Sequence, residues 1–264
     1  MDTCYTLITA HSGCNNTSPN SLESIITGME MGADFVEVDV RSTKDGLPVL
    51  FHDDFIKTVD HGEVRVSDHT LTELNRLIKT NSKERNQITE IITLNDAIII
   101  ANDFGGLLNV DVKDDQCIVP MTKALKKAHM VDSVIISGCE YTRAASLKKN
   151  YPEFQVLLNL SKKMFLDSEK SASAIADEIC HMAVKASCCG INIQFKYLTD
   201  ELIQTAQRRF LPISIWTLTE SDKPDKYLNM GLYSITTLAV DILVEKRKRF
   251  IKKMALPGIV PEKI

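Results

Sequence analysis

Residues 35–54 read Phe-Val-Glu-Val-Asp-Val-Arg-Ser-Thr-Lys-Asp-Gly-Leu-Pro-Val-Leu-Phe-His-Asp-Asp. In the first half of this stretch charged residues alternate with valines. The period of two predicts a β-strand over Phe35–Val40 with Glu37, Asp39 and Arg41 on one face and the valines on the other. Two carboxylates therefore point the same way.

The second half of the stretch predicts a β-hairpin. Asp45-Gly46 stands between two apolar runs, which is typical of a tight turn, and the returning strand covers Leu47–His52. A two-residue loop would place His52 opposite Asp39, whereas a longer loop would shift the register. A histidine beside two convergent carboxylates suits a metal-assisted acid/base site.

Eight strand-like runs alternate with helical stretches along the chain. Residues 22–29, for example, carry apolar side chains at a helical period behind Ser21, which can cap the helix. This alternation favours a closed (β/α)8 TIM barrel, with an open doubly wound sheet as the alternative. The runs are Thr6–Ala10, Phe35–Val40, Leu107–Lys113, Ser133–Ser137, Gln155–Asn159, Gly190–Gln194, Pro212–Thr217 and Tyr233–Thr237.

One segment does not fit the repeat and is interpreted as an insertion. The hairpin strand Leu47–His52 directly follows the second barrel strand, and Phe55–Gly106 is polar, with one predicted helix near Thr93–Ala101. We expect residues 44–106 to lie over the C-terminal face of the barrel, where such folds carry their active sites. Without a linker or repeat, residues 1–264 are predicted to be one domain.

Composition excludes several classes of partner. The net charge is -4, from 31 basic and 35 acidic residues, so broad attraction to nucleic acid is not expected. No signal peptide or membrane-spanning run is predicted. The seven cysteines form no CxxC pair, which indicates free thiols and a cytoplasmic location.

A predicted helix near the C-terminus carries a cluster of cations. Its main interpretation is a solvated helix face with cations near the helix C-terminus, and contact with an anionic membrane surface is the alternative. The residues predict no oligomeric state. The cations are Lys246, Arg247, Lys248, Arg249, Lys252 and Lys253.

Further polar residues follow two other predicted strands. His11 comes directly after the first strand, at the strand end where barrel loops assemble sites. In the strand over residues 107–113, alternation directs Asn109, Asp111 and Lys113 to one face. We expect these side chains to join the first cluster inside the barrel mouth.

Three carboxylates at the mouth of one barrel repel one another, and this repulsion has to be offset. Each close pair among Glu37, Asp39 and Asp111 repels by about 4 kcal/mol at about 4 Å with an effective dielectric near 20. Protonation of one acid or a bound cation would offset this repulsion. All-oxygen ligands favour Mg²⁺ or Ca²⁺ over zinc.

Several motifs resemble the glycerophosphodiester phosphodiesterase family of TIM barrels. They follow the family's order along most of the chain, and the block over residues 32–53 is the most specific. The motifs are Ala10-His11-Ser12-Gly13, Pro19-Asn20-Ser21, Gly32-Ala33-Asp34-Phe35-Val36-Glu37-Val38-Asp39-Val40, Thr43-Lys44-Asp45-Gly46-Leu47-Pro48-Val49-Leu50-Phe51-His52-Asp53 and Trp216-Thr217.

The resemblance implies a phosphoric diester hydrolase. Its expected reaction is metal-dependent hydrolysis of a glycerophosphodiester to sn-glycerol 3-phosphate and an alcohol, with two histidines as acid and base. Which histidine donates the proton is not predicted. The implied residues are His11 and His52 for catalysis, Glu37, Asp39 and Asp111 for the metal, and Lys113 and Trp216 for the substrate.

The chain departs from the family pattern at four places. Ser12 stands where the family has arginine, and Arg41 is a candidate replacement for that charge. The glutamate of Pro-Glu-Asn-Thr is missing at 19–21, Asp111 replaces a glutamate, and only Thr236-Thr237 represents the terminal Thr-Asp-x-Pro element. Because both histidines and three acids remain, the pattern favours an altered substrate or a reduced rate over loss of activity.

Two other functions stay open at this point. A non-catalytic barrel that binds a phosphate ester would explain the missing arginine, but such a module has no need of paired proton-transfer groups. A lyase acting on lysophospholipids would use a neighbouring substrate hydroxyl as nucleophile and release a cyclic phosphate.

Overall fold

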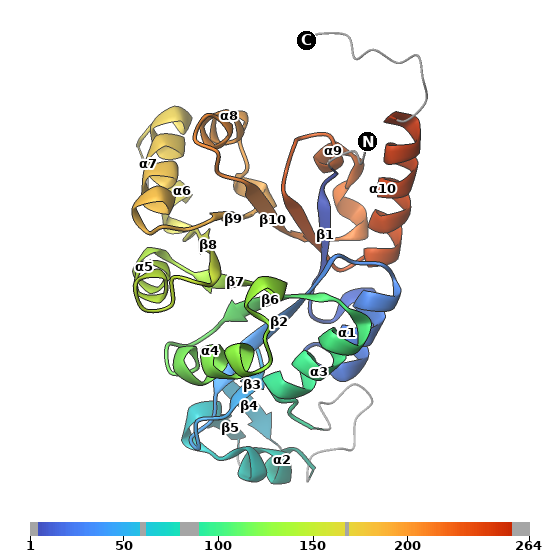
Figure 1. Cartoon of the computed structure of the whole chain (residues 1–264), viewed down its shortest axis with the longest axis vertical. Helices are drawn as coiled ribbons and strands as arrows, with labels where there is room; N and C mark the ends of the chain where they lie inside the picture. The colour runs from blue at the N-terminus through green and yellow to red at the C-terminus, as the bar shows by residue number, and fades with distance from the viewer. Residues whose placement is uncertain (1–4, 59–61, 80–89, 167–168, 255–264) are drawn as a thin grey trace.

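Eight parallel strands form a closed ring with helices between them (Figure 1). The computed structural model describes residues 5–58, 62–79, 90–166 and 169–254. In ring order the strands are β1 (Leu7–Ala10), β2 (Phe35–Ser42), β6 (Leu107–Val112), β7 (Val134–Cys139), β8 (Gln155–Asn159), β9 (Gly190–Gln194), β10 (Ile213–Leu218) and β11 (Ser234–Thr237).

The ring closes because β1 pairs in parallel with both β11 and β2. This closure confirms the predicted (β/α)8 TIM barrel and excludes the open sheet. All eight predicted strands are present, and their ends differ from the prediction by at most two residues.

Helices follow most of the strands and surround the ring in Figure 1. The helix after β1 begins behind Ser21, whose hydroxyl accepts the N–H of Ser24 at 3.1 Å, as the capping pattern predicts. Apart from α2, which is described with the insertion below, the helices are α1 (Leu22–Glu30), α3 (Leu94–Phe104), α4 (Ile118–Lys127), α5 (Tyr141–Asn150), α6 (Lys163–Leu166), α7 (Ala172–Lys185), α8 (Asp200–Arg208), α9 (Asp225–Leu228) and α10 (Val240–Met254).

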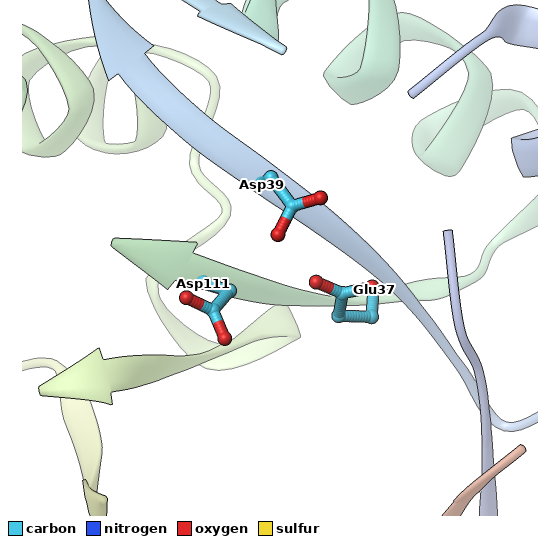
Figure 2. Close-up of side chains that lie close together, drawn as sticks. All are labelled: Glu37, Asp39 and Asp111. Carbon is cyan, nitrogen blue, oxygen red and sulfur yellow. The ribbon is translucent and has the colours of Figure 1, made fainter. Parts of the chain in front are cut away.

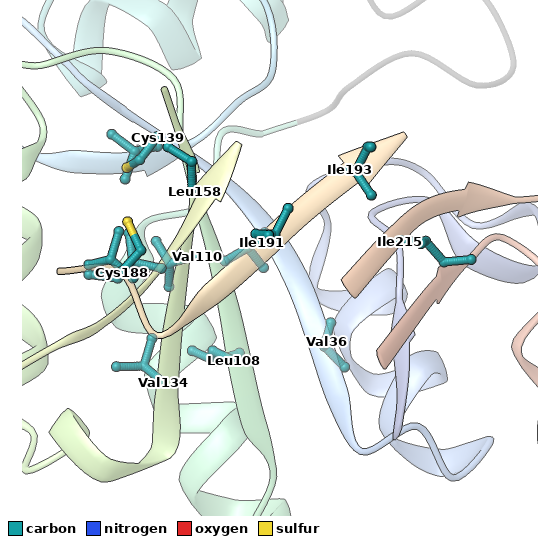
Figure 3. Close-up of a cluster of buried hydrophobic side chains, with 14 of the residues drawn as sticks. Val36, Leu108, Val110, Val134, Cys139, Leu158, Cys188, Ile191, Ile193 and Ile215 are labelled. Atoms are coloured by element: carbon teal, nitrogen blue, oxygen red, sulfur yellow. The ribbon is translucent and has the colours of Figure 1, made fainter. Parts of the chain in front are cut away.

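The barrel strands separate apolar from polar side chains by alternation. Val36 in β2 and Leu108 and Val110 in β6 are at most 1 % exposed and belong to the large hydrophobic cluster sampled in Figure 3. Their neighbours Asn109 and Asp111 line a cavity at the mouth of the barrel instead. The hydrophobic layer thus holds the strands while the opposite strand faces are free to carry polar groups.

The predicted hairpin exists, but its register is shifted by one residue. Strand β3 (Pro48–Leu50) runs antiparallel to β2, and the N–H of Phe51 donates to the carbonyl of Asp39 at 3.0 Å. Phe51, not His52, therefore lies opposite Asp39, and the predicted pairing was wrong.

The turn explains this shift. Thr43 and Leu47 close the loop through an N–H···O bond of 3.1 Å, and Gly46 donates to the carbonyl of Thr43 at 2.9 Å. Gly46 adopts a φ of 74°, which a three-residue hairpin loop requires at its last position. The loop thus spans residues 44–46, one residue more than Asp45-Gly46 alone.

The insertion has a small hydrophobic core of its own. It contains the antiparallel strands β4 (Phe55–Thr58) and β5 (Gly62–Arg65) and the helix α2 (Leu71–Lys79), none of which the sequence pattern predicted. These elements lie together at the lower end of Figure 1, next to β3. The core consists of Val49, Phe51, Ile56, Val66, Leu74, Ile78 and Ile91.

The predicted basic helix near the C-terminus is α10, and one of its cations is buried. Arg247 pairs with Asp34, donates to the backbone carbonyls of Thr6 before β1 and Gly32 before β2, and covers the ring of Tyr5 at 4.9 Å. This cation therefore ties α10 to the barrel, while membrane contact of the other cations stays a prediction. In the described ranges no helix is long and apolar enough to cross a bilayer.

We expect Arg247→Ala to lower the free energy of unfolding by about 2–3 kcal/mol, because it leaves the largely buried Asp34 carboxylate without its counter-ion. Arg249→Ala on the same helix is the matched control. Its side chain is 77 % exposed, and its one ion pair among the described residues is with Glu245, so its loss should cost less than about 0.5 kcal/mol. Urea titrations measure both values, and equal losses would contradict a tethering role for Arg247.

Candidate active site

Three carboxylates converge at the mouth of the barrel (Figure 2). β2 supplies Glu37 and Asp39, and β6 supplies Asp111, which is the register partner of Asp39. One oxygen of each carboxylate lies within 4.8 Å of the others. The structure thus brings together the three acids that alternation placed on inward strand faces.

The surroundings shift the pKa values of Glu37 and Asp39, the two acids of β2, in opposite directions. Burial raises the pKa of Glu37 well above its usual range, and the charges of Asp39 and Asp111 raise it further. Burial also acts on Asp39, but the Lys113 ammonium at 2.9 Å and the Asn20 amide at 2.8 Å outweigh it and lower the Asp39 pKa. Glu37 is therefore the acid least able to stay charged without a further cation.

Lys113 is the cation that currently balances this cluster. Its ammonium lies 2.9 Å from Asp39 and 3.0 Å from Asp111. Although burial alone would lower its pKa, the two carboxylates raise the pKa of Lys113 to about 12. One ammonium faces three carboxylates, so the cluster still carries excess negative charge.

The cluster fits a divalent cation. Its donors are carboxylate oxygens, which Mg²⁺ and Ca²⁺ prefer, and they come from two adjacent strands that hold them close together. A bound cation would remove the repulsion that raises the Glu37 pKa. The N–H of Ser12 already donates to Glu37 at 2.9 Å and orients that side chain.

Gly138, near the end of β7, leaves space for the Asp111 side chain because it has no Cβ atom. Gly138 has a φ of 71°, and a Cβ atom added there would lie 2.2 Å from Oδ1 of Asp111. Arg143 closes the same corner by donating to the carbonyls of Val112 at 2.7 Å and Gly138 at 2.9 Å. Neither Gly138 nor Arg143 was predicted from the sequence, although a glycine at the end of a strand was an available signal.

Both candidate catalytic histidines lie at this mouth. His11 follows β1, and its Nδ1 lies 2.7 Å from the carbonyl of Ser12. His52 is 63 % exposed, with Nδ1 2.7 Å from the carboxylate of Asp53. Because a carbonyl or carboxylate oxygen only accepts, Nδ1 carries the proton in each ring. Neither Nε2 makes a hydrogen bond within the described part of the chain, so each can take part in proton transfer.

Strand pairing explains why both histidines reach the same cavity despite the shifted register. One edge of β2 pairs with two strands. The N-terminal residues Phe35 and Val36 of this edge pair with β1, and its C-terminal residues pair with β3. His11 directly follows β1 and His52 follows β3, so both histidines lie near the part of this edge between the two pairings.

Arg41 holds the His52 loop. Its guanidinium donates to the carbonyl of His52 at 3.0 and 2.9 Å and pairs with Asp54 at 2.5 Å. It lies outside the set of residues that line the cavity. The structure therefore gives no support to Arg41 as a phosphate contact.

All the other predicted site residues line one cavity of about 640 Å³. Three buried polar atoms of this lining have no hydrogen-bond partner in the described part of the chain: Asn109 Oδ1, Ser137 Oγ and Trp216 Nε1. Since buried polar groups are normally paired, this cavity is suited to a polar ligand. Ser137 was missed because a lone serine at a strand end is a weak signal.

Comparison with known proteins identifies the family of the chain. The family model of the glycerophosphoryl diester phosphodiesterase family matches residues 11–242. The chain belongs to this family. Since proteins named for this activity are phosphoric diester hydrolases, the chain is an enzyme of that class.

Individual phosphodiesterases of this family match over most of their length. The enzyme of Caldanaerobacter subterraneus subsp. tengcongensis is 26 % identical over 241 residues, 88 % of this chain and 93 % of that protein. The Bacillus subtilis enzyme is 23 % identical over 263 residues, 92 % and 87 % of the two chains. An Oleispira antarctica phosphodiesterase, solved in complex with the product sn-glycerol-3-phosphate, superposes with a TM-score of 0.75 at 24 % identity, covering 92 % of this chain and 97 % of that one.

Ser12, one of the departures from the phosphodiesterase family pattern, has a defined place. Its hydroxyl accepts the N–H of Asn20 at 2.6 Å, and the Asn20 amide in turn contacts Asp39. Ser12 is 4 % exposed and therefore positions Asn20 and Glu37 without contributing a positive charge. The shorter Asp111 still reaches the acidic cluster.

Proposed function

We propose that the chain hydrolyses a glycerophosphodiester to sn-glycerol 3-phosphate and an alcohol, with a divalent cation held by Glu37, Asp39 and Asp111 and with His11 and His52 as the proton-transfer pair. The observation that supports this most is the single cavity that these five residues share. The product complex of the Oleispira antarctica phosphodiesterase fits the same reaction.

The roles follow from the chemistry of the groups. One histidine accepts the proton of a water that attacks phosphorus, and the other protonates the leaving alkoxide as its bond to phosphorus breaks. A divalent cation, when bound, supplies positive charge for the developing phosphoryl oxygens. Lys113 and Trp216 are proposed substrate contacts, because both line the cavity beside the acids.

A ³¹P NMR assay tests this proposal. Incubation of glycerophosphocholine with Mg²⁺ or Ca²⁺ should yield the signal of sn-glycerol 3-phosphate, and metal depletion should stop its appearance. A transient or final cyclic phosphate would instead reveal lyase chemistry. Ligand-induced thermal stabilisation without turnover of any glycerophosphodiester would favour the non-catalytic binding barrel.

We expect Mg²⁺ or Ca²⁺ to raise the melting temperature of the wild type and to leave that of Glu37→Gln nearly unchanged. Saturating metal at about 100 times Kd stabilises a folded protein by about 2.7 kcal/mol, provided its ligands are intact. The variant keeps an acceptor for the Ser12 N–H but loses a charged ligand.

Differential scanning fluorimetry with and without metal measures this shift. Asp103→Asn, which removes an exposed carboxylate on α3, is the control and should respond to metal like the wild type. An undiminished metal shift in Glu37→Gln would remove Glu37 from the proposed ligand set.

Two broader proposals accompany the reaction. We propose that residues 1–264 act as one phosphodiesterase domain, with the hairpin and insertion over 44–106 as part of it. We also propose a cytoplasmic location, because the described cysteines are free thiols, as a reducing compartment favours. These are Cys14, Cys117, Cys139, Cys180, Cys188 and Cys189.

A further inference from the structure

Four lysine and arginine side chains among the described residues line the catalytic cavity, and two of them are already engaged. Lys113 is held by Asp39 and Asp111. Arg143 donates to the carboxylate of Asp115 at 2.6 Å and to two backbone carbonyls. The positive charge of each is therefore already balanced by carboxylates, so neither adds uncompensated charge for an anionic ligand.

Lys162 and Lys163 are the other two cations of the lining. They follow β8, and Lys163 begins the short helix α6. Both side chains are exposed at the cavity, and within the described ranges neither makes a hydrogen bond or an ion pair. Their ammonium groups, on flexible four-carbon stems, are thus free to follow a ligand.

On the opposite side of the barrel mouth, no described lysine or arginine lines the cavity. The β1 loop presents Ser12, which is buried and hydrogen-bonded to Asn20 and Glu37. In the ring β8 lies four strands from β1 in either direction. The cavity thus carries the unpaired ammonium groups of Lys162 and Lys163 on the side of the barrel opposite His11.

We propose that Lys162 and Lys163 bind the phosphodiester anion of the substrate. This inference rests on the proposed function, because that function supplies the anion. Lys113 and a bound divalent cation together only neutralise the three carboxylates, so further cations are needed to attract a phosphodiester anion to the cavity. The two lysines supply such charge as binding groups, while proton transfer stays with the histidines.

Steady-state kinetics of Lys162→Ala/Lys163→Ala test the pair. We expect KM for glycerophosphocholine to rise about tenfold or more with kcat within about threefold, since the contact is made before and during the reaction. The double arginine variant should restore KM, because it restores the charge. Lys185→Ala, which removes an exposed lysine at the end of α7 outside this cavity, is the control.

The nature of the bound group is tested with different leaving groups. The rise in KM should be similar for glycerophosphocholine and for glycerophosphoinositol phosphate. A rise in KM for glycerophosphoinositol phosphate alone would overturn the proposal, because the lysines would then bind the anionic leaving group and not the phosphodiester. An unchanged KM in an active enzyme would also overturn it and leave the proposed function intact.

A binding measurement separates this proposal from the reaction. Calorimetric titration with sn-glycerol 3-phosphate should show at least about tenfold weaker binding to the double alanine variant than to the wild type. If the wild type turns over none of the substrates, the proposed function fails, and equal affinity of both proteins would overturn the lysine pair separately.

Discussion

We expect His11→Ala and His52→Ala each to lower kcat on glycerophosphocholine by about 10²–10⁴-fold, the range for a lost general acid or base. Both imidazoles line the cavity with the acidic cluster, and each has Nδ1 fixed by an oxygen. Their Nε2 atoms are therefore the groups that can exchange protons with substrate. Steady-state assays of purified variants measure the loss.

The choice of substrate separates the two roles. Bis(p-nitrophenyl) phosphate has a leaving group that needs no proton, so the variant lacking the general acid should lose far less activity on it than on glycerophosphocholine. The variant lacking the base should lose similar activity on both. Equal behaviour of the two variants on both substrates would count against an acid/base pair.

His181→Ala is the matched control for these variants. His181 is exposed on α7, contacts Arg209 and lies outside the cavity lining. Its removal should leave kcat unchanged. If both His11 and His52 act in one turnover, the double variant should be little worse than the weaker single variant, because the groups act as a unit.

The barrel strands were predictable because their signal is local. Each buried strand is short and apolar, and the helix that follows has its own period and cap, as Ser21 shows for α1. The direction of the Glu37 and Asp39 side chains in β2 was equally predictable, because these residues alternate with buried valines. Period and sequence order were therefore sufficient for the fold and for most of the site.

The hairpin register was not predictable from the same pattern. Asp45-Gly46 suits a two-residue loop, and it also fits the end of a three-residue loop with Gly46 in the left-handed region. The choice depends on the Thr43–Leu47 closure, which is a tertiary outcome. The site survives the shift because His52 lies beyond the paired residues, in a loop held by Arg41.

The lining residues that were not predicted from the sequence are brought to the cavity by distant parts of the chain. Lys162 and Lys163 follow an ordinary strand, and only ring closure places them in the cavity with His11. Arg143 looks like any helix arginine until its contact with the β6 backbone is known. The positions of these residues in the cavity can be found only from the folded structure, because no local sequence spacing indicates them.

Gly138→Ala should lower kcat/KM by about 100-fold or more. The added methyl would lie 2.2 Å from Oδ1 of Asp111 and 2.7 Å from the backbone nitrogen of Val112, both far inside van der Waals contact. Asp111 is itself held between Lys113 and the other acids, so it must leave the cluster to make room. Displacement of a reacting-centre group by about 1 Å costs on the order of 10²-fold in rate.

Gly105→Ala separates this displacement from simple backbone strain. Gly105 has a φ of 62°, close to that of Gly138, but a Cβ atom added there meets no heavy atom within 4 Å. Both variants bear the cost of a left-handed alanine, about 1–2 kcal/mol in unfolding free energy. Only Gly138→Ala should also lose metal-dependent stabilisation and activity. Equal activity in the two variants would contradict this prediction and show that catalysis does not require Asp111 at its present position.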